Sequence, residues 1–154
     1  MIPITAYSDQ RVGVLGLGRS GLAAARALEA GGAVPVCWDD REIARAECPS
    51  EVVDLSRERE VAELAALIVS PGIPHLYPAP HPAVVQALAA SVPVDNDVGL
   101  FFNELPNLEP DDDPLPQVIA ITGSNGKSTT TALIAHILTA AGKTVQMGGN
   151  IGRG

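Results

Sequence analysis

The chain has 154 residues, of which 46% are hydrophobic and 18% are charged, and its formal net charge is −8. Its apolar fraction excludes an intrinsically disordered chain, and its length allows one full domain or one domain with part of another. The acidic balance argues against general binding of nucleic acid or anionic membranes. No apolar run approaches the ~18 residues that span a bilayer, and no signal-peptide pattern opens the chain. We therefore expect a cytoplasmic protein without membrane insertion.

Strands and helices alternate from residue 11 onward, which is typical of a parallel sheet with helices on both faces. Pro35 is unfavourable in a central strand, so we place it near the start of its strand. The expected strands are 11–16, 33–38, 67–69 and 92–94, and the expected helices are 20–30, 58–66 and 82–90. Residues 98–105 read as a short amphipathic segment. This order predicts a Rossmann-like α/β domain over residues 1–105.

A linker and the beginning of a second unit follow. Residues 106–117 contain four prolines and four acidic residues, a composition that predicts an extended, solvated linker. Residues 118–121 and 143–147 read as strands around a helix at 128–141, as in a P-loop ATPase-type α/β domain. The unit at 118–154 has 37 residues, and below roughly 40 residues a chain rarely supports its own core. We therefore expect a truncated start of a larger domain.

A glycine-rich loop connects the first strand to the first helix. Gly16-Leu17-Gly18-Arg19-Ser20-Gly21 matches the G-x-G-x-x-G pattern, and Asp39 and Asp40 follow Gly21 by 18 and 19 residues. That spacing is near the ~20 residues expected for a ribose-binding acid in an NAD site. Because the same turn can hold any diphosphate, the pattern leaves three readings open: an NAD site, a site for another nucleotide, or a tightly packed turn.

A second loop of this kind lies in the second unit. Gly123-Ser124-Asn125-Gly126-Lys127-Ser128-Thr129 stands between an expected strand and an expected helix. Backbone N–H groups of such a loop bind phosphate oxygens, a lysine reaches the β- and γ-phosphates, and a serine hydroxyl binds Mg²⁺. The usual pattern has glycine where Ile121 stands, so this loop is a variant. The alternative is a plain strand–turn–helix with a solvent-facing Lys127.

Two shorter polar turns also follow expected strands. Ser70-Pro71-Gly72 should lie at the carboxyl edge of the sheet beside the first glycine loop, although such a sequence is often only a turn. Asn150 lies among glycines after the last expected strand, where a left-handed turn residue and a functional residue are equally good readings. The histidines His75, His81 and His136 have no partner at metal or catalytic spacing, so we read them as structural or solvated.

In order and spacing, these motifs together resemble the Mur ligase family, from about Val12 to the end of the chain. The resemblance implies that the first glycine loop holds the uridine diphosphate of a muramoyl substrate. The implied residues are Gly18, Arg19 and Ser20 at the diphosphate, Asp39, Asp40 and Arg41 with Ser70, Pro71 and Gly72 at the uridine, and Asn150 near the reacting centre. The second loop would bind ATP through Lys127, Ser128 and Thr129, with Ser128 as a magnesium ligand.

The resemblance also implies a reaction. The Ser-Asn version of the ATP loop favours the branch of the family that adds D-glutamate to UDP-N-acetylmuramoyl-L-alanine at the expense of ATP. The substrate carboxylate attacks the γ-phosphate, and the amine of D-glutamate then displaces phosphate from the acyl phosphate. Lys127, the expected catalytic residue here, and Mg²⁺ stabilise the transferred phosphoryl group. The resemblance implies a monomer at full length.

Two departures from the family pattern bear on activity. Gly99 stands where the family usually has an acidic residue, and the magnesium-binding Glu, the carbamylated Lys and the D-glutamate domain of the family cannot be placed. The charge distribution agrees, because all 18 acidic residues lie at or before Asp113, whereas a Mg²⁺–nucleotide site uses carboxylate oxygens. We expect a chain that is inactive alone and releases no phosphate from ATP, muramoyl substrate and D-glutamate.

Three alternatives remain. An NAD(P)-dependent oxidoreductase or sensor module fits the first loop and Asp39 and Asp40, but it leaves the second loop unexplained. A generic P-loop NTPase or switch explains the second loop without an amino-sugar nucleotide. A sister ligase that adds another amino acid would differ in regions beyond Gly154.

Overall fold

The computed structural model describes residues 1–108 and 116–148, and the chain divides into two compact units, Met1–Glu109 and Pro110–Gly154. Among the described residues, no helix combines the length and the hydropathy that crossing a membrane would require.

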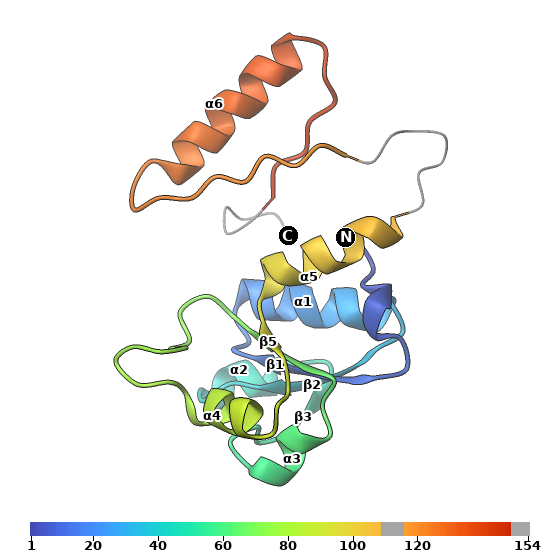
Figure 1. Ribbon diagram of the computed structural model, residues 1–154, viewed down its shortest axis with the longest axis vertical. Coiled ribbons are helices and arrows are strands. Elements are labelled where there is room, and N and C mark those ends of the chain that lie inside the picture. The colour runs from blue at the N-terminus through green and yellow to red at the C-terminus, as the bar shows by residue number, and fades with distance from the viewer. Residues whose placement is uncertain (109–115, 149–154) are drawn as a thin grey trace. The chain divides into compact units, whose positions relative to one another are not determined.

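The first unit is built on a five-stranded parallel sheet with the order β3-β2-β1-β4-β5 (Figure 1). Between β1 and β4 the strand order reverses direction, and in open α/β sheets ligands bind at the carboxyl ends of the strands at such a point. The strands are β1 (Arg11–Leu15), β2 (Val34–Trp38), β3 (Glu51–Val52), β4 (Ala66–Val69) and β5 (Val94–Asp95).

Helices cover both faces of this sheet, as the sequence predicts. One face packs under α1 (Arg19–Ala30), α2 (Glu42–Ala46) and α5 (Asp97–Glu104), and the other under α3 (Glu58–Ala62) and α4 (Pro82–Ala89). Figure 1 shows α1 and α4 on opposite sides of the strands. Two short 3-10 turns, η1 (Thr5–Tyr7) and η2 (Leu105–Asn107), complete the unit. The predicted Rossmann-like α/β class is confirmed.

Two details of the expected first unit were wrong. The helix expected over 58–66 ends at Ala62, because Ala65 N donates to Arg11 O at 2.8 Å and draws the following residues into the sheet beside β1. Pairing with a neighbouring strand here overrides local helix preference. The short elements α2 and β3 were not predicted, because runs of five and two residues carry too little periodicity to be recognised.

Pro35 lies near the start of β2, as expected. Val34 N donates to Gln10 O at 2.8 Å, so the next backbone nitrogen faces away from β1 and toward the β3 side. There β3 pairs only with Val36 and Cys37. The missing N–H of Pro35 therefore costs the sheet no hydrogen bond.

The second unit contains one helix, α6 (Lys127–Ala140), within residues 116–148. No strand forms over 118–121 or 143–147, so these two predictions were wrong. A strand needs a hydrogen-bonded neighbour and a covering layer, and this short segment buries too little to provide them. Leu133 and Ile137, on the expected apolar face of α6, are each 56% exposed.

Candidate nucleotide-binding site

The glycine loop after β1 is shaped by a close approach between its two ends. Gly16 has a φ of +88°, in the left-handed region that favours glycine. A Cβ on Gly21 would lie 1.8 Å from Gly16 O, so only glycine allows the first turn of α1 to meet the end of β1. Ser70 Oγ, from the turn after β4, donates to the same Gly16 O at 2.7 Å.

The start of α1 presents unpaired backbone donors. Gly18 is the N-cap of α1, with extended dihedrals and no side-chain cap. Among the hydrogen bonds of residues 1–108 and 116–148, none uses the N–H of Gly18, Arg19, Ser20 or Gly21. A helix N-terminus with such free N–H groups favours an anion, because the donors and the helix dipole act in the same direction.

Asp39, directly after β2, fixes the other side of the loop. Its Oδ2 accepts from Leu17 N at 2.7 Å and from Arg41 Nη2 at 3.2 Å, while Oδ1 accepts from Arg41 N at 2.9 Å and Arg41 Nε at 3.1 Å. Burial opposes ionisation, but the hydrogen bonds from the Arg41 side chain and from the Leu17 and Arg41 amides outweigh it and lower the pKa of Asp39 below its ordinary 3.8. Asp39 is 5% exposed, and its carboxylate already accepts hydrogen bonds from four donors.

We expect Asp39→Asn to lower the free energy of unfolding by about 2 kcal/mol at neutral pH, because an amide replaces a charged acceptor and turns its NH₂ toward donors. The folded-state pKa is depressed, so the carboxylate stabilises the fold above its ordinary pKa of 3.8, and this contribution is lost as pH falls through the lower folded value. Urea unfolding followed by the fluorescence of Trp38 measures the effect. Glu63→Gln, at an exposed position, is the control; equal stability of Asp39→Asn and wild type would contradict the role of Asp39.

Asp40 is the exposed carboxylate of the pair. Its side chain is 70% exposed, and His81 Nε2 lies 3.3 Å from Oδ1 and 3.2 Å from Oδ2. Arg45 Nη1 donates to the carbonyl oxygens of Asp39 at 2.7 Å and Asp40 at 2.9 Å, and its guanidinium lies over Trp38, 4.6 Å from the ring centroid. The turn after β2 is therefore stabilised by Arg45 through its backbone carbonyls and by His81 through the Asp40 carboxylate.

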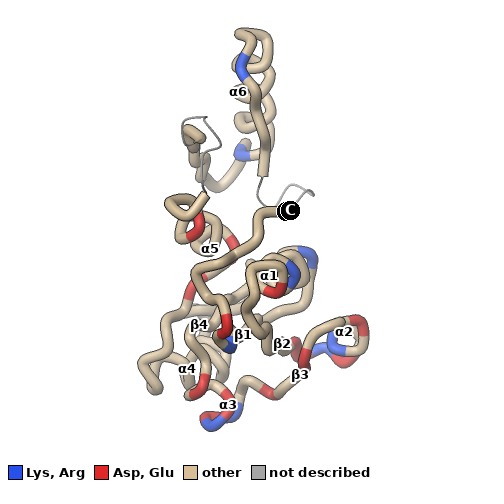
Figure 2. The backbone as a smooth tube through the Cα atoms, turned by 90° about the vertical axis from the view of Figure 1, so that its right-hand side faces the viewer, with Lys and Arg blue, Asp and Glu red and all other residues tan. Residues whose placement is uncertain are grey.

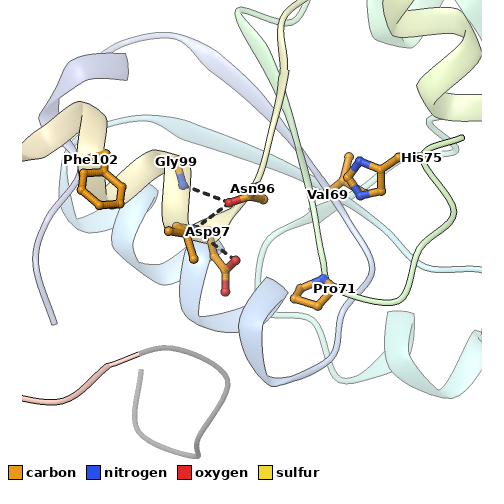
Figure 3. A pocket seen from close by; sticks show the side chains of 8 residues that line it. Val69, Pro71, His75, Asn96, Asp97, Gly99 and Phe102 are labelled. Atoms are coloured by element: carbon orange, nitrogen blue, oxygen red, sulfur yellow. Dashed lines mark hydrogen bonds between the residues drawn. The ribbon is translucent and has the colours of Figure 1, made fainter. Parts of the chain in front are cut away.

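A hollow of about 510 Å³ opens between the turn after β4 and the start of α5. Figure 3 shows Pro71 and His75 on one side of it and Asn96, Asp97 and Gly99 on the other. Its lining residues are Val69, Pro71, His75, Asn96, Asp97, Val98, Gly99 and Phe102. The sequence did not predict this hollow. One signal for it was present, because Asn96 is a favoured N-cap residue before a helix, and its Oδ1 accepts from Val98 N and Gly99 N.

Gly99, the departure from the family pattern, contacts a carboxylate of this chain. A Cβ on Gly99 would lie 1.8 Å from Asp95 Oδ1. Asp95 in turn accepts from Asn96 N at 2.8 Å and from Asn103 Nδ2 at 3.1 Å. In this structure, therefore, the absence of a side chain at position 99 makes room for the Asp95 carboxylate.

In the second unit, the predicted phosphate loop leads directly into α6. Gly123 and Gly126 have φ values of +147° and +77°, and Gly126 is the N-cap of the helix. Within residues 116–148, no hydrogen bond uses the N–H groups of residues 124–129. Lys127 Nζ donates to the carbonyl oxygens of Gly123 and Ser124, so the ammonium lies over the loop. Figure 2 shows lysines and no acidic residue on the described part of this unit.

The structure thus brings together one set of predicted residues. The glycine loop, the turn after β2 and Ser70 lie at one edge of the sheet, joined by the Leu17–Asp39 and Ser70–Gly16 hydrogen bonds. The exposed Pro71 and Gly72 follow Ser70, and Gly72 has a φ of +97°. Asn150 lies outside the described residues. Among the described residues, no cluster of three or more His, Cys, Asp or Glu could hold a metal ion.

No family model matches the chain. Over its whole length it is 59% identical to a protein of Cereibacter sphaeroides named UDP-N-acetylmuramoylalanine--D-glutamate ligase, and 59% and 56% identical to proteins of the same name from Ruegeria pomeroyi and Dinoroseobacter shibae. It covers 34% of each of them, so the chain spans about a third of the length of these curated relatives. Shikimate dehydrogenase of Aquifex aeolicus resembles it with a TM-score of 0.48 and 15% identity, over 61% of this chain and 44% of that one.

The order of the five parallel strands and the helix layers define the first unit as a doubly wound, Rossmann-like α/β domain. The chain belongs to the Mur ligase family and corresponds to the N-terminal part of the D-glutamate ligases named above.

Proposed function

We propose that the chain supplies the substrate-binding and part of the ATP-binding machinery of a ligase that adds D-glutamate to UDP-N-acetylmuramoyl-L-alanine. The observation that carries the proposal is the row of N–H groups from Gly18 to Gly21, which are free of hydrogen bonds to the described residues and lie at the point where the strand order reverses. A diphosphate fits such a row, and the names of the relatives supply the class of nucleotide.

The proposal gives each of the predicted residues a separate role. Gly18, Arg19 and Ser20 would bind the diphosphate through backbone N–H groups and the Arg19 charge. Asp40 and Arg41, whose side chains are each 70% exposed, would face the uridine together with the turn Ser70-Pro71-Gly72. The resemblance implies a contact between Asp39 and the uridine, but we assign Asp39 a supporting role instead. Its two carboxylate oxygens already accept hydrogen bonds from Leu17 and Arg41 and have little capacity to accept more from a ligand.

The second loop would bind the triphosphate of ATP. The amides of residues 124–129 and the ammonium of Lys127 suit phosphate oxygens, and Ser128 would offer a hydroxyl to Mg²⁺. When bound, Mg²⁺ neutralises charge on the phosphates.

The proposed chemistry begins when the substrate carboxylate attacks the γ-phosphorus and ADP leaves. The D-glutamate amine then attacks the acyl carbon, loses a proton and expels phosphate. Because residues 116–148 contain no carboxylate side chain, the remaining magnesium ligands are expected elsewhere, and Asn150 would contact the substrate.

The carboxylates after β2 and the second glycine loop support the NAD-binding alternative less well. An NAD site needs a carboxylate that accepts from the ribose hydroxyls, whereas Asp39 is 5% exposed and accepts from four N–H donors. Asp40 is accessible, but one exposed acid suits the ribose of either nucleotide. The second glycine loop, with Lys127 lying over it, has no role in an NAD module.

Titration calorimetry with UDP and with NADH separates the two functions. We expect UDP to bind this chain at least about tenfold more tightly than NADH, a difference of about 1.4 kcal/mol. Arg19→Ala should weaken UDP binding, because it removes the charge beside the free amides. Tighter binding of NADH, or no binding of UDP, would overturn the proposal.

A further inference from the structure

His81 connects two parts of the sheet edge that are separated by a strand. Asp40 follows β2, whereas His81 lies in the segment between β4 and α4, and β1 runs between β2 and β4. The contact between His81 Nε2 and the Asp40 carboxylate, at 3.2 and 3.3 Å, therefore passes the carboxyl end of β1. That end is where the glycine loop begins.

The elements on the two sides of this end of β1 pack on opposite faces of the sheet. The glycine loop continues into α1 on one face, and His81 caps α4 on the other (Figure 1). A ligand bound over the end of β1 would thus have the free amides of the glycine loop on one side and the Asp40–His81 pair on the other.

The orientation of the His81 ring is fixed by its second nitrogen. Nδ1 accepts from Ala83 N at 3.1 Å, so the neutral ring carries its proton on Nε2 and donates it toward Asp40. The side chain is 9% exposed, and His81 N also donates to Pro74 O at 2.9 Å, which closes the base of the exposed loop 74–81. The ring is thus held at both ends, whereas Asp40 keeps accessible oxygen lone pairs.

We propose that His81 is a positioning residue, which holds the Asp40 carboxylate beside the carboxyl end of β1 so that it accepts hydrogen bonds from the ribose hydroxyls of the bound nucleotide. This inference rests on the proposed uridine diphosphate site. It assigns the ribose contact to Asp40 rather than Asp39, because Asp40 alone of the two has exposed oxygens. It also gives a role to a histidine that sequence spacing left as structural.

The discriminating variant is His81→Asn in the complete chain. Asparagine is a favoured N-cap and can keep the bond to Ala83 N, but it is too short to reach Asp40. We expect UDP affinity to fall about tenfold, as for the loss of one hydrogen bond to a charged group. Affinity for inorganic pyrophosphate should not change, because the glycine-loop amides are untouched. Tyr77→Ala, in the same loop and 88% exposed, should bind both ligands as wild type does.

A double-mutant cycle with Asp40→Asn tests whether His81 acts through Asp40. If it does, the variant carrying both changes binds UDP no more weakly than Asp40→Asn alone. Additive losses, equal losses for UDP and pyrophosphate, or wild-type affinity in His81→Asn would each overturn the positioning role while leaving the proposed function intact. A wild-type chain that binds pyrophosphate but not UDP would overturn both.

Discussion

Gly21→Ala is expected to destabilise the first unit by about 3 kcal/mol or more, and to abolish UDP binding with it. The added Cβ would lie 1.8 Å from Gly16 O and 2.7 Å from Ser70 Oγ. Neither neighbour is free to move away. Gly16 N donates to Trp38 O at 2.7 Å, Ser70 N donates to Leu15 O at 2.9 Å, and Ser70 Oγ is bonded to Gly16 O. The strain must therefore separate α1 from the sheet.

Gly18→Ala is the matched control for this variant. A Cβ on Gly18 meets nothing within 4 Å, and its φ of −75° suits any residue. Its stability should stay within about 0.5 kcal/mol of wild type, whereas UDP binding should weaken because the methyl group covers free amides. Urea unfolding followed by Trp38 fluorescence reports stability, and calorimetry reports binding. A Gly21→Ala chain that unfolds at the wild-type urea concentration would refute this account of the loop.

Glu104→Ala is expected to lower the free energy of unfolding by about 3 kcal/mol, because it removes a buried charged acceptor and leaves several donors unpaired. Glu104 is 2% exposed at the end of α5 and accepts from Thr5 N at 2.7 Å, Thr5 Oγ1 at 2.6 Å and Ala6 N at 3.2 Å. It thus ties the N-terminal segment to α5. Glu104→Gln keeps the shape and one acceptor oxygen, so its loss should be smaller, about 1–2 kcal/mol.

The same carboxylate predicts a pH dependence. Burial opposes ionisation, but the hydrogen bonds from the Thr5 side chain and from the Ala6 and Thr5 amides outweigh it and lower the pKa of Glu104 below its ordinary 4.5. A depressed folded-state pKa means that the stabilisation is present above the ordinary value and is lost as pH falls through the folded one. The difference between wild type and Glu104→Gln should therefore shrink in acid. An unchanged difference down to the acid transition would contradict the assignment.

The sequence was sufficient to predict elements with strong periodicity or a defining turn. The strand–Gly loop–helix unit at Arg11–Ala30 and the proline-led helix at Pro82 have such signals, and both form as expected. The helix expected to reach Ala66 stops earlier because pairing with β1 is a long-range contact, which local pattern does not contain. The expected strands at 118–121 and 143–147 failed for a related reason, since a strand depends on neighbours that residues 116–148 do not supply.

The candidate site also has one feature that the sequence predicted and others that it could not. Glycine spacing predicted the position of the tight turn between β1 and α1, because the close contact at Gly21 allows no side chain. Spacing did not distinguish Asp39 from Asp40, since adjacent residues have nearly the same offset from the loop. Only the folded structure distinguishes them: the Asp39 carboxylate accepts from Leu17 N, and the exposed Asp40 carboxylate contacts His81. The contact between Asp40 and His81 joins residues 41 positions apart, so no local pattern indicates it.

The central claim is that the amides at the start of α1 bind the diphosphate of a uridine nucleotide. Backbone ¹H–¹⁵N spectra of the chain, recorded during titration with UDP and separately with NADH, test it most directly. The account predicts that UDP shifts the N–H signals of Gly18, Arg19, Ser20 and Gly21 at concentrations where NADH leaves them in place. Signals that respond to NADH but not to UDP would contradict it.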